Sequence, residues 1–335
     1  MGKKGKGKGG KKEKKPAVDP EKGMNEAKAF IRDFPEACKT LGVEPLALPL
    51  DRGEEGTGPF LRLAVHRGCA AVFAPQHMRA LAIALQPYSF LQRLCLWSVP
   101  LRDQGCKDLG QYVAQNRTVL SLEATDCGVT TLGCKHIGEA LERNATLQSL
   151  KLDHNQALGA DGVQLLGESL RLNRGLQQLS LTFCGLEGET GAMPISTQLL
   201  HAPTLRVLEL KGNRFGHEGV AMVVRALKTC ASLFRIDLAD TGFATHAEVH
   251  GAFEECFEQN TTCHEYALAG NPIGDTTAYR WLGMVRRLPH LIYLDVTNNL
   301  DPILFKQIGD ATASNKKDWL KRQKSKGKKG GKKKK

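Results

Sequence analysis

The sequence predicts an α/β solenoid built from short strand–helix units, on three observations. An apolar pattern begins eight times at intervals of 28–30 residues, which is typical of a stacked repeat. At the start of each unit apolar and polar residues alternate, as in a strand with one buried face. Later in each unit apolar residues recur at helical spacing. The units begin at Leu91, Val119, Leu147, Leu176, Leu205, Leu233, Cys263 and Leu291.

The clearest unit shows what each position does. Leu208 and Leu210 alternate with exposed residues and form the strand. Asn213 follows where the chain turns away, and its amide can satisfy backbone groups that the turn leaves open. Ala226 and Leu227 lie at helical spacing in the second half of the unit. The residues that correspond to Asn213 in the other units are Cys127, Asn155, Cys184, Thr241, Asn271 and Asn299.

Each helical half closes with a recurring pattern, seen in Leu141–Asn144 and Leu170–Asn173. With the 28/29-residue period, this pattern resembles the ribonuclease-inhibitor type of leucine-rich repeat over Leu91–Leu300. The resemblance implies a right-handed horseshoe with parallel strands on the concave face and helices on the convex face. It does not imply one activity, because that family binds many different partners.

The segments before the repeats are a tail and a cap. Residues 1–23 are rich in Lys and Gly and are predicted to be disordered, since little apolar surface offsets the entropy of ordering. Residues 24–58 are predicted to form a helix over Asn25–Leu41, with a break near Pro35, and then a linker. The apolar side chains available to pack from this helix are Phe30, Ile31 and Phe34.

A degenerate capping repeat is expected over residues 59–90. Leu61 and Leu63 would supply its strand, and a helix would follow. The apolar residues that fall where the later helices do are Met78, Leu81, Ala84 and Leu85. After the repeats of residues 91–300, Asp301-Pro302 has the form of a helix start, an N-cap followed by proline. This predicts a capping helix over residues 301–323 and a disordered lysine-rich tail over residues 324–335.

The charge lies mainly at the two ends. The formal net charge is +12, but residues 1–15 contribute +7 and residues 316–335 contribute +11, which leaves −6 for the solenoid. We interpret the tails as electrostatic tethers for an acidic surface. The lysines assigned to this role are Lys3, Lys4, Lys11, Lys12, Lys328, Lys329, Lys332 and Lys333.

Several function classes find no support in the sequence. No apolar run approaches the roughly 20 residues that a membrane span requires, and no secretory signal is expected. The ten cysteines are scattered singly, which favours reduced thiols. His246 and His250 stand four residues apart without a third metal ligand at a telling spacing. We therefore expect a protein that is not an enzyme and has no metal or cofactor.

The outward residues of the predicted strands form the candidate binding surface. Acidic residues outnumber basic ones there, and Asp126 and Asp240 follow directly. The surface suits a basic or amphipathic protein segment, with Trp97 as an aromatic anchor. The alternative is an ordinary solvated sheet face. The residues assigned to partner binding are Trp97, Glu123, Lys151, Asp153, Glu209, Lys211, Asp237 and Asp295.

The lysine tails leave several partners open. Runs of lysine without aromatic residues attract acidic surfaces, such as nucleic acid, an anionic membrane or the tails of tubulin, but do not read bases, so any nucleic-acid binding would be non-specific. Lys/Gly-rich ends on a repeat scaffold are similar to those of proteins of the ciliary axoneme. This favours a cytoplasmic, cytoskeletal scaffold that meets the acidic tails of tubulin. A ribosome-associated or nucleolar factor is the second interpretation. A GTPase activator is the third, although such activators carry an acidic segment where this chain has Lys324–Lys335.

Overall fold

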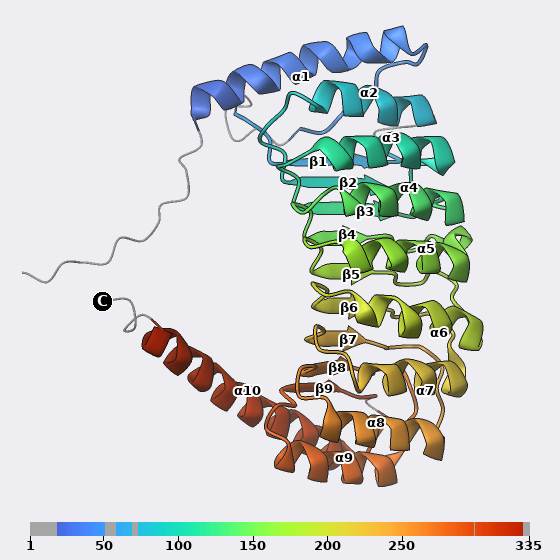
Figure 1. The fold of residues 1–335 in the computed structure, drawn as a ribbon, viewed down its shortest axis with the longest axis vertical. Coiled ribbons are helices and arrows are strands. Elements are labelled where there is room, and N and C mark those ends of the chain that lie inside the picture. The colour runs from blue at the N-terminus through green and yellow to red at the C-terminus, as the bar shows by residue number, and fades with distance from the viewer. Residues whose placement is uncertain (1–18, 51–57, 69–72, 298, 331–335) are drawn as a thin grey trace, which may run out of the picture.

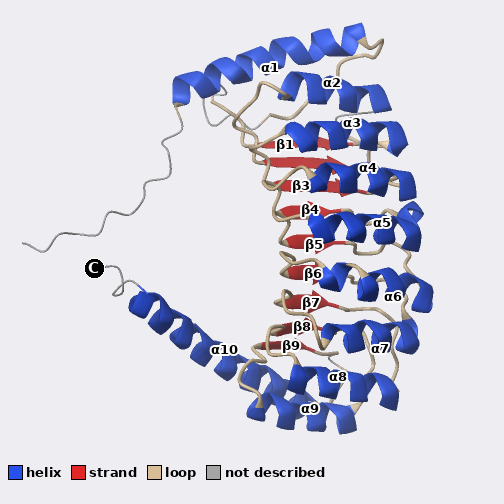
Figure 2. Cartoon of the chain, viewed as in Figure 1, coloured by secondary structure: helices blue, strands red, loops and turns tan. Residues whose placement is uncertain are grey.

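The computed structural model of the chain describes residues 19–50, 58–68, 73–297 and 299–330. Within them, nine parallel strands form one sheet in chain order. Helices cover the outer face of this sheet, and its inner, concave face is open (Figure 1). Figure 2 shows the same alternation of strand and helix along the whole length. The predicted leucine-rich repeat solenoid is confirmed.

The elements follow the repeat frame, with one strand and one helix to a unit. The strands are β1 (Arg62–His66), β2 (Arg93–Trp97), β3 (Ser121–Thr125), β4 (Ser149–Lys151), β5 (Gln178–Ser180), β6 (Val207–Glu209), β7 (Arg235–Asp237), β8 (Glu265–Ala267) and β9 (Tyr293–Asp295). The helices are α1 (Pro20–Thr40), α2 (Pro75–Leu85), α3 (Arg102–Gln115), α4 (Thr131–Glu142), α5 (Gly159–Leu172), α6 (Gly188–Thr197), α7 (Gly216–Leu227), α8 (Ala247–Gln259), α9 (Asp275–Arg287) and α10 (Pro302–Gly330).

The central apolar residue of each strand lies in register with the next and points into the core. Leu208 of β6, for example, lies between Leu179 and Ile236 and is fully buried. The row continues through every strand, so neighbouring units share one continuous core. Its members are Leu63, Leu94, Leu122, Leu150, Leu179, Leu208, Ile236, Tyr266 and Leu294.

A buried asparagine ties each of several units to the one before it. The Oδ1 of Asn213 accepts hydrogen bonds from the backbone N–H groups of Cys184 and Leu186, at 3.0 and 3.2 Å. Its Nδ2 donates to the carbonyls of Leu181 and Leu210, both at 2.8 Å. One amide therefore satisfies four backbone groups of two units, as the sequence predicted.

Asn155 and Asn271 make the same bridge, but the expectation for the last unit is wrong. Asn299 is exposed, and none of the described contacts of its side chain reaches the preceding unit. The position in the repeat alone does not make an asparagine a bridge between units, because the amide bridge forms only where the turn around the asparagine is buried.

A second set of asparagines links the helix ends, and α10 supplies its last member. Asn173 donates from Nδ2 to the carbonyls of Leu141 and Asn144, at 2.6 and 2.8 Å. In the same way, Asn315 of α10 donates to the carbonyls of Val285 and Leu291, at 2.8 and 2.9 Å. Helix α10 thus takes the place of a further unit, and it supplies the hydrogen-bond donor for these backbone carbonyls at the end of the array.

The N-terminal helix differs from its predicted limits. Helix α1 begins at Pro20, capped by the side chain of Asp19, and continues through Pro35 without a break. A proline inside a helix costs about 3 kcal/mol. The buried side chains of Phe34 and Cys38, on both sides of the proline, offset this cost by packing.

Ile31, expected to pack, and Leu61, expected in the strand of the capping repeat, are both exposed. Ile31 of α1 is 42% exposed, and Leu61 lies before β1 and is 47% exposed. Leu63 and Val65 fill the inward positions of β1, because side chains two residues apart share a face of a strand. The helix expected over the capping repeat is present as α2, with Met78 and Leu85 fully buried.

The C-terminal helix starts as predicted and ends later. Asp301 caps α10 by accepting hydrogen bonds from the N–H groups of Ile303 and Leu304, both at 2.9 Å. The helix then reaches Gly330, so residues 324–330, assigned to the tail, are helical. Of Lys328 and Lys329 only the backbone is described. Lys3, Lys4, Lys11, Lys12, Lys332 and Lys333 lie outside the described residues, as does part of the predicted linker.

Candidate protein-binding face

The residue after the central apolar one of each strand forms a row across the concave face, and this row holds five of the predicted binding residues, while Trp97, Asp153 and Lys211 lie two positions further along their chains. The strand register places Glu209 of β6 beside Asp237 of β7, and Glu123 of β3 beside Lys151 of β4. Three members of the row are buried rather than exposed, namely Cys95, Ser180 and Ala267. Their side chains are small. The charged members that remain partly exposed are Glu123, Lys151, Glu209, Asp237 and Asp295.

Trp97 is engaged by its own chain. Its Nε1 donates to Oε2 of Glu123 at 3.2 Å, and the guanidinium of Arg62 lies 5.1 Å from the centre of its ring. The indole therefore already has a cation within the distance of a cation–π interaction. Its role as an anchor for a partner stays a prediction, now with the condition that Arg62 moves or shares the ring.

Two further predicted residues have partners within the described face. Asp153 accepts from the Oγ of Ser180 at 2.6 Å and from the N–H of Thr182 at 2.9 Å. Lys211 pairs with Asp240, at 3.3 Å between Nζ and Oδ2. These contacts fix the positions of the Asp153 and Lys211 side chains on the face.

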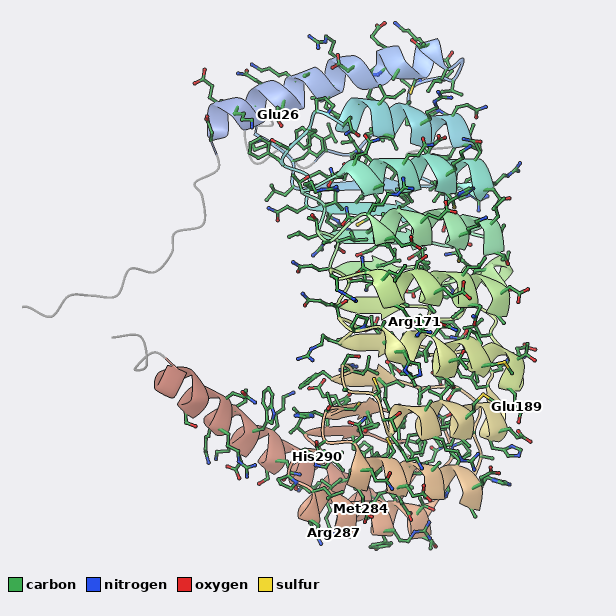
Figure 3. All side chains as sticks on the ribbon, in the orientation of Figure 1. Glu26, Arg171, Glu189, Met284, Arg287 and His290 are labelled. Carbon is green, nitrogen blue, oxygen red and sulfur yellow. The ribbon has the colours of Figure 1, made fainter. Side chains whose placement is uncertain are left out.

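Glu209 and Lys151 differ, since neither side chain hydrogen-bonds or pairs with another described residue. The convex face behaves in the opposite way. Arg287 of α9, labelled in Figure 3, pairs with Glu258 of α8 at 2.6 Å. Lys228 and Glu255 pair at 2.8 Å between neighbouring helices. The helical side thus satisfies many of its own charges, whereas Glu209 offers an unpaired carboxylate to solvent.

A second row on the concave face was missed at the sequence level. In each strand, the residues directly before and directly after the central apolar residue point to the same face, because they stand two positions apart. The residues before the central one therefore form this second row. This row holds Arg93 of β2 and Arg235 of β7, which offset part of the acidity. A hollow of about 520 Å³ on this face is lined by residues of both charges, among them Arg93, Glu123, Lys151 and Arg206.

Helix α10 is joined to this second row. Arg235 pairs with Glu265 at 3.4 Å, and its guanidinium lies 5.3 Å from the centre of the Tyr293 ring. Lys316 of α10 reaches the same Glu265 at 3.7 Å. Trp319 packs on the rings of Phe234 and His264, which immediately precede β7 and β8. Burial is the main cause that raises the pKa of Tyr293, and the negative charge of the nearby Asp295 raises it further.

The described residues contain no group of three or more His, Cys, Asp or Glu side chains placed to hold a metal ion. His246 and His250 do not form a pair, because His246 precedes α8 while His250 is buried and its Nδ1 contacts Oγ1 of Thr277 at 2.8 Å. All nine described cysteines are buried as free thiols, and burial raises the pKa of Cys127 and Cys184 to about 12. Nowhere in the described chain is a helix both long and apolar enough for a membrane crossing.

Sequence comparison finds the same repeat class. The family described as "Leucine Rich repeat" matches residues 143–167 and 201–224. The human "NACHT, LRR and PYD domains-containing protein 13" is 32% identical over 165 residues, which cover 49% of this chain. The match spans only 13% of that protein's length. The finer assignment to the ribonuclease-inhibitor type stays a prediction.

Comparison with solved structures returns matches at low identity and with TM-scores below 0.5. The tropomodulin C-terminal domain of Caenorhabditis elegans is 12% identical, with a TM-score of 0.39, and the match covers 58% of this chain and 98% of that domain. The actin-binding site 2 of leiomodin-1 is 18% identical, with a TM-score of 0.35 and coverage of 42% and 80%. A yeast complex of Rad7 and Elc1 gives 12% identity, a TM-score of 0.37 and coverage of 68% and 59%.

Proposed function

We propose that this protein is a non-enzymatic scaffold whose concave face binds a basic segment of a protein partner. The observation that carries the proposal is the pair Glu209 and Asp237, adjacent in register and partly exposed, with Glu209 unpaired among the described residues. A cationic side chain from a partner would meet two carboxylates there. Because the surrounding sheet is rigid and already folded, little ordering entropy opposes the contact.

Reversing these two charges tests the proposal. We expect Glu209→Lys with Asp237→Lys to weaken partner binding by roughly tenfold or more, since like charges would then face each other. The measurement is quantitative recovery of partners on the immobilised full chain. The matched control is Asp161→Lys with Glu189→Lys, two exposed acidic residues on the neighbouring convex helices α5 and α6. Equal recovery with the concave and the convex variants would reject the proposal.

We further propose that the lysine-rich ends hold the scaffold on an acidic polymer, with the microtubules of a cilium or flagellum as the first choice. In the view of Figure 1, α1 begins and α10 ends on the same side of the solenoid. The exposed end of α10 adds Lys321, Arg322 and Lys324 to this basic surface. The two basic ends therefore lie on one side of the solenoid in this view.

Removing the tails should separate the tether from the solenoid. Deletion of residues 1–15 and 324–335 is expected to weaken microtubule binding and to flatten its dependence on salt, because fewer counterions are released. The melting temperature should stay nearly constant, since residues 321–325 are exposed. The assay is co-sedimentation with intact microtubules, with microtubules whose acidic tails are cleaved, and with ribosomal RNA at one ionic strength. Unchanged binding after cleavage, with tight RNA binding, would favour the ribosomal alternative.

A further inference from the structure

One row at the edge of the concave face is built from residues with left-handed backbone. In each of these turns, the residue that follows the concave-face positions has a positive φ, between 52° and 78°. Gly, Asp and Asn accept this conformation readily, whereas a bulky side chain is strained in it. The members of the row are Ser98, Asp126, His154, Phe183, Gly212, Asp240 and Gly270.

Phe183 is the misfit in this row. Its φ is +54°, and 39% of its side chain is exposed, so its strain is only partly offset by burial. The next member, Gly212, makes room for it, because a Cβ there would lie 2.1 Å from Cε1 of Phe183. The left-handed backbone of an aromatic residue lowers the stability of the fold, and strained backbone of this kind is typical of functional sites.

The neighbours of Phe183 complete a surface with defined chemistry. The ring of His154 stacks on it, with 5.1 Å between centroids and 19° between planes. His154 is itself exposed, and the next member beyond it is the exposed Asp126. No other described side chain hydrogen-bonds or pairs with the Asp126 carboxylate. The uncommitted carboxylate of Asp126 therefore stands next to His154 in the row, and His154 stacks on Phe183.

We propose that this rim surface, formed by Asp126, His154 and Phe183, receives an arginine side chain of the protein partner. The inference rests on the proposed docking at the concave face, and it names the residue type and the place at which that partner is anchored. The rim borders the same face, since Asp153 and Thr182 directly precede His154 and Phe183.

Arginine fits this surface better than lysine. A planar guanidinium can lie against the exposed part of the rings and direct its N–H groups to a carboxylate at the same time. A lysine ammonium is compact and strongly hydrated, so it gains less from the rings. An apolar anchor would leave the charge of Asp126 without a partner.

The test uses two pentapeptides, one with a single arginine between glycines and one with lysine in its place. Each is titrated into the full chain carrying ¹³C-labelled phenylalanine and followed by NMR. We expect a saturable shift of the Phe183 ring resonance with the arginine peptide, and at least fivefold weaker binding of the lysine peptide. Phe183→Asn should weaken arginine binding at least fivefold without lowering the melting temperature, because Asn tolerates positive φ. Phe183→Tyr keeps the ring and should preserve binding.

Each other result counts against the proposal. Absence of a saturable shift, equal affinity for both peptides, or unchanged affinity of Phe183→Asn would overturn it. A marked fall in the melting temperature of Phe183→Asn would show that the ring serves the fold. Recovery of the protein partner distinguishes failure of the arginine site from failure of the proposed function. If Glu209→Lys with Asp237→Lys loses the partner and Phe183→Asn keeps it, the concave face stands and the rim does not. If both variants keep it, both proposals fail.

Discussion

Replacement of Asn213 by leucine is expected to lower the free energy of unfolding by about 4 kcal/mol or more, because four buried backbone groups lose their partner and each such loss costs about 1–3 kcal/mol. The amide of Asn213 serves four backbone groups in two units, and the site is fully buried. Leucine has a similar volume but can satisfy none of these groups. The measurement is equilibrium denaturation followed by circular dichroism.

The control for this variant is Asn299→Leu, at the same position of the last unit. Asn299 is exposed and makes no bridge of this kind among the described residues, so the change should stay within about 0.5 kcal/mol. Equal losses for the two variants would mean that the amide bridge does not stabilise the array. Asn213→Thr should be intermediate, since Thr241 at the equivalent position still donates to the carbonyl of Leu238 at 2.7 Å.

Leu208→Ala should lower the free energy of unfolding by about 2–5 kcal/mol, the range for removing a buried leucine from a packed core. Leu208 is fully buried between Leu179 and Ile236, in the middle of the array. Because each unit contacts only its neighbours, the loss should also reduce the cooperativity of unfolding. The control is Leu172→Ala, whose side chain is 63% exposed. A loss below about 0.5 kcal/mol at Leu208 would show that the repeat frame is misplaced.

The repeat period was sufficient to predict the fold because the period and the core have the same physical origin. Leu208 recurs in equivalent form in every unit, since each strand must bury one residue against the next. The positions on the concave face follow from the same frame, and Glu209 and Asp237 lie side by side as expected. Their role in binding stays a prediction.

The features that the sequence did not reveal depend on contacts outside the period. Helix α1 continues through Pro35 because its second half packs on the array, which local propensity does not report. Asn315 occupies a place set by the path of α10 rather than by a repeat position. The position of Phe183 could have been found, since Gly212 and Gly270 mark equivalent positions as left-handed. The pairing of Trp97 with Arg62 and Glu123 required the register of three strands.

Site-specific cross-linking shows whether the partner lies on the concave face. A photoreactive amino acid is placed at Glu209 on the concave face or at the exposed Lys135 of α4 on the convex face. Each full-length variant is irradiated with the partner bound, and the cross-linked product is quantified. Binding of the partner on the concave face predicts a strong product from position 209 and little from position 135. A strong product from position 135 with none from position 209 would contradict it.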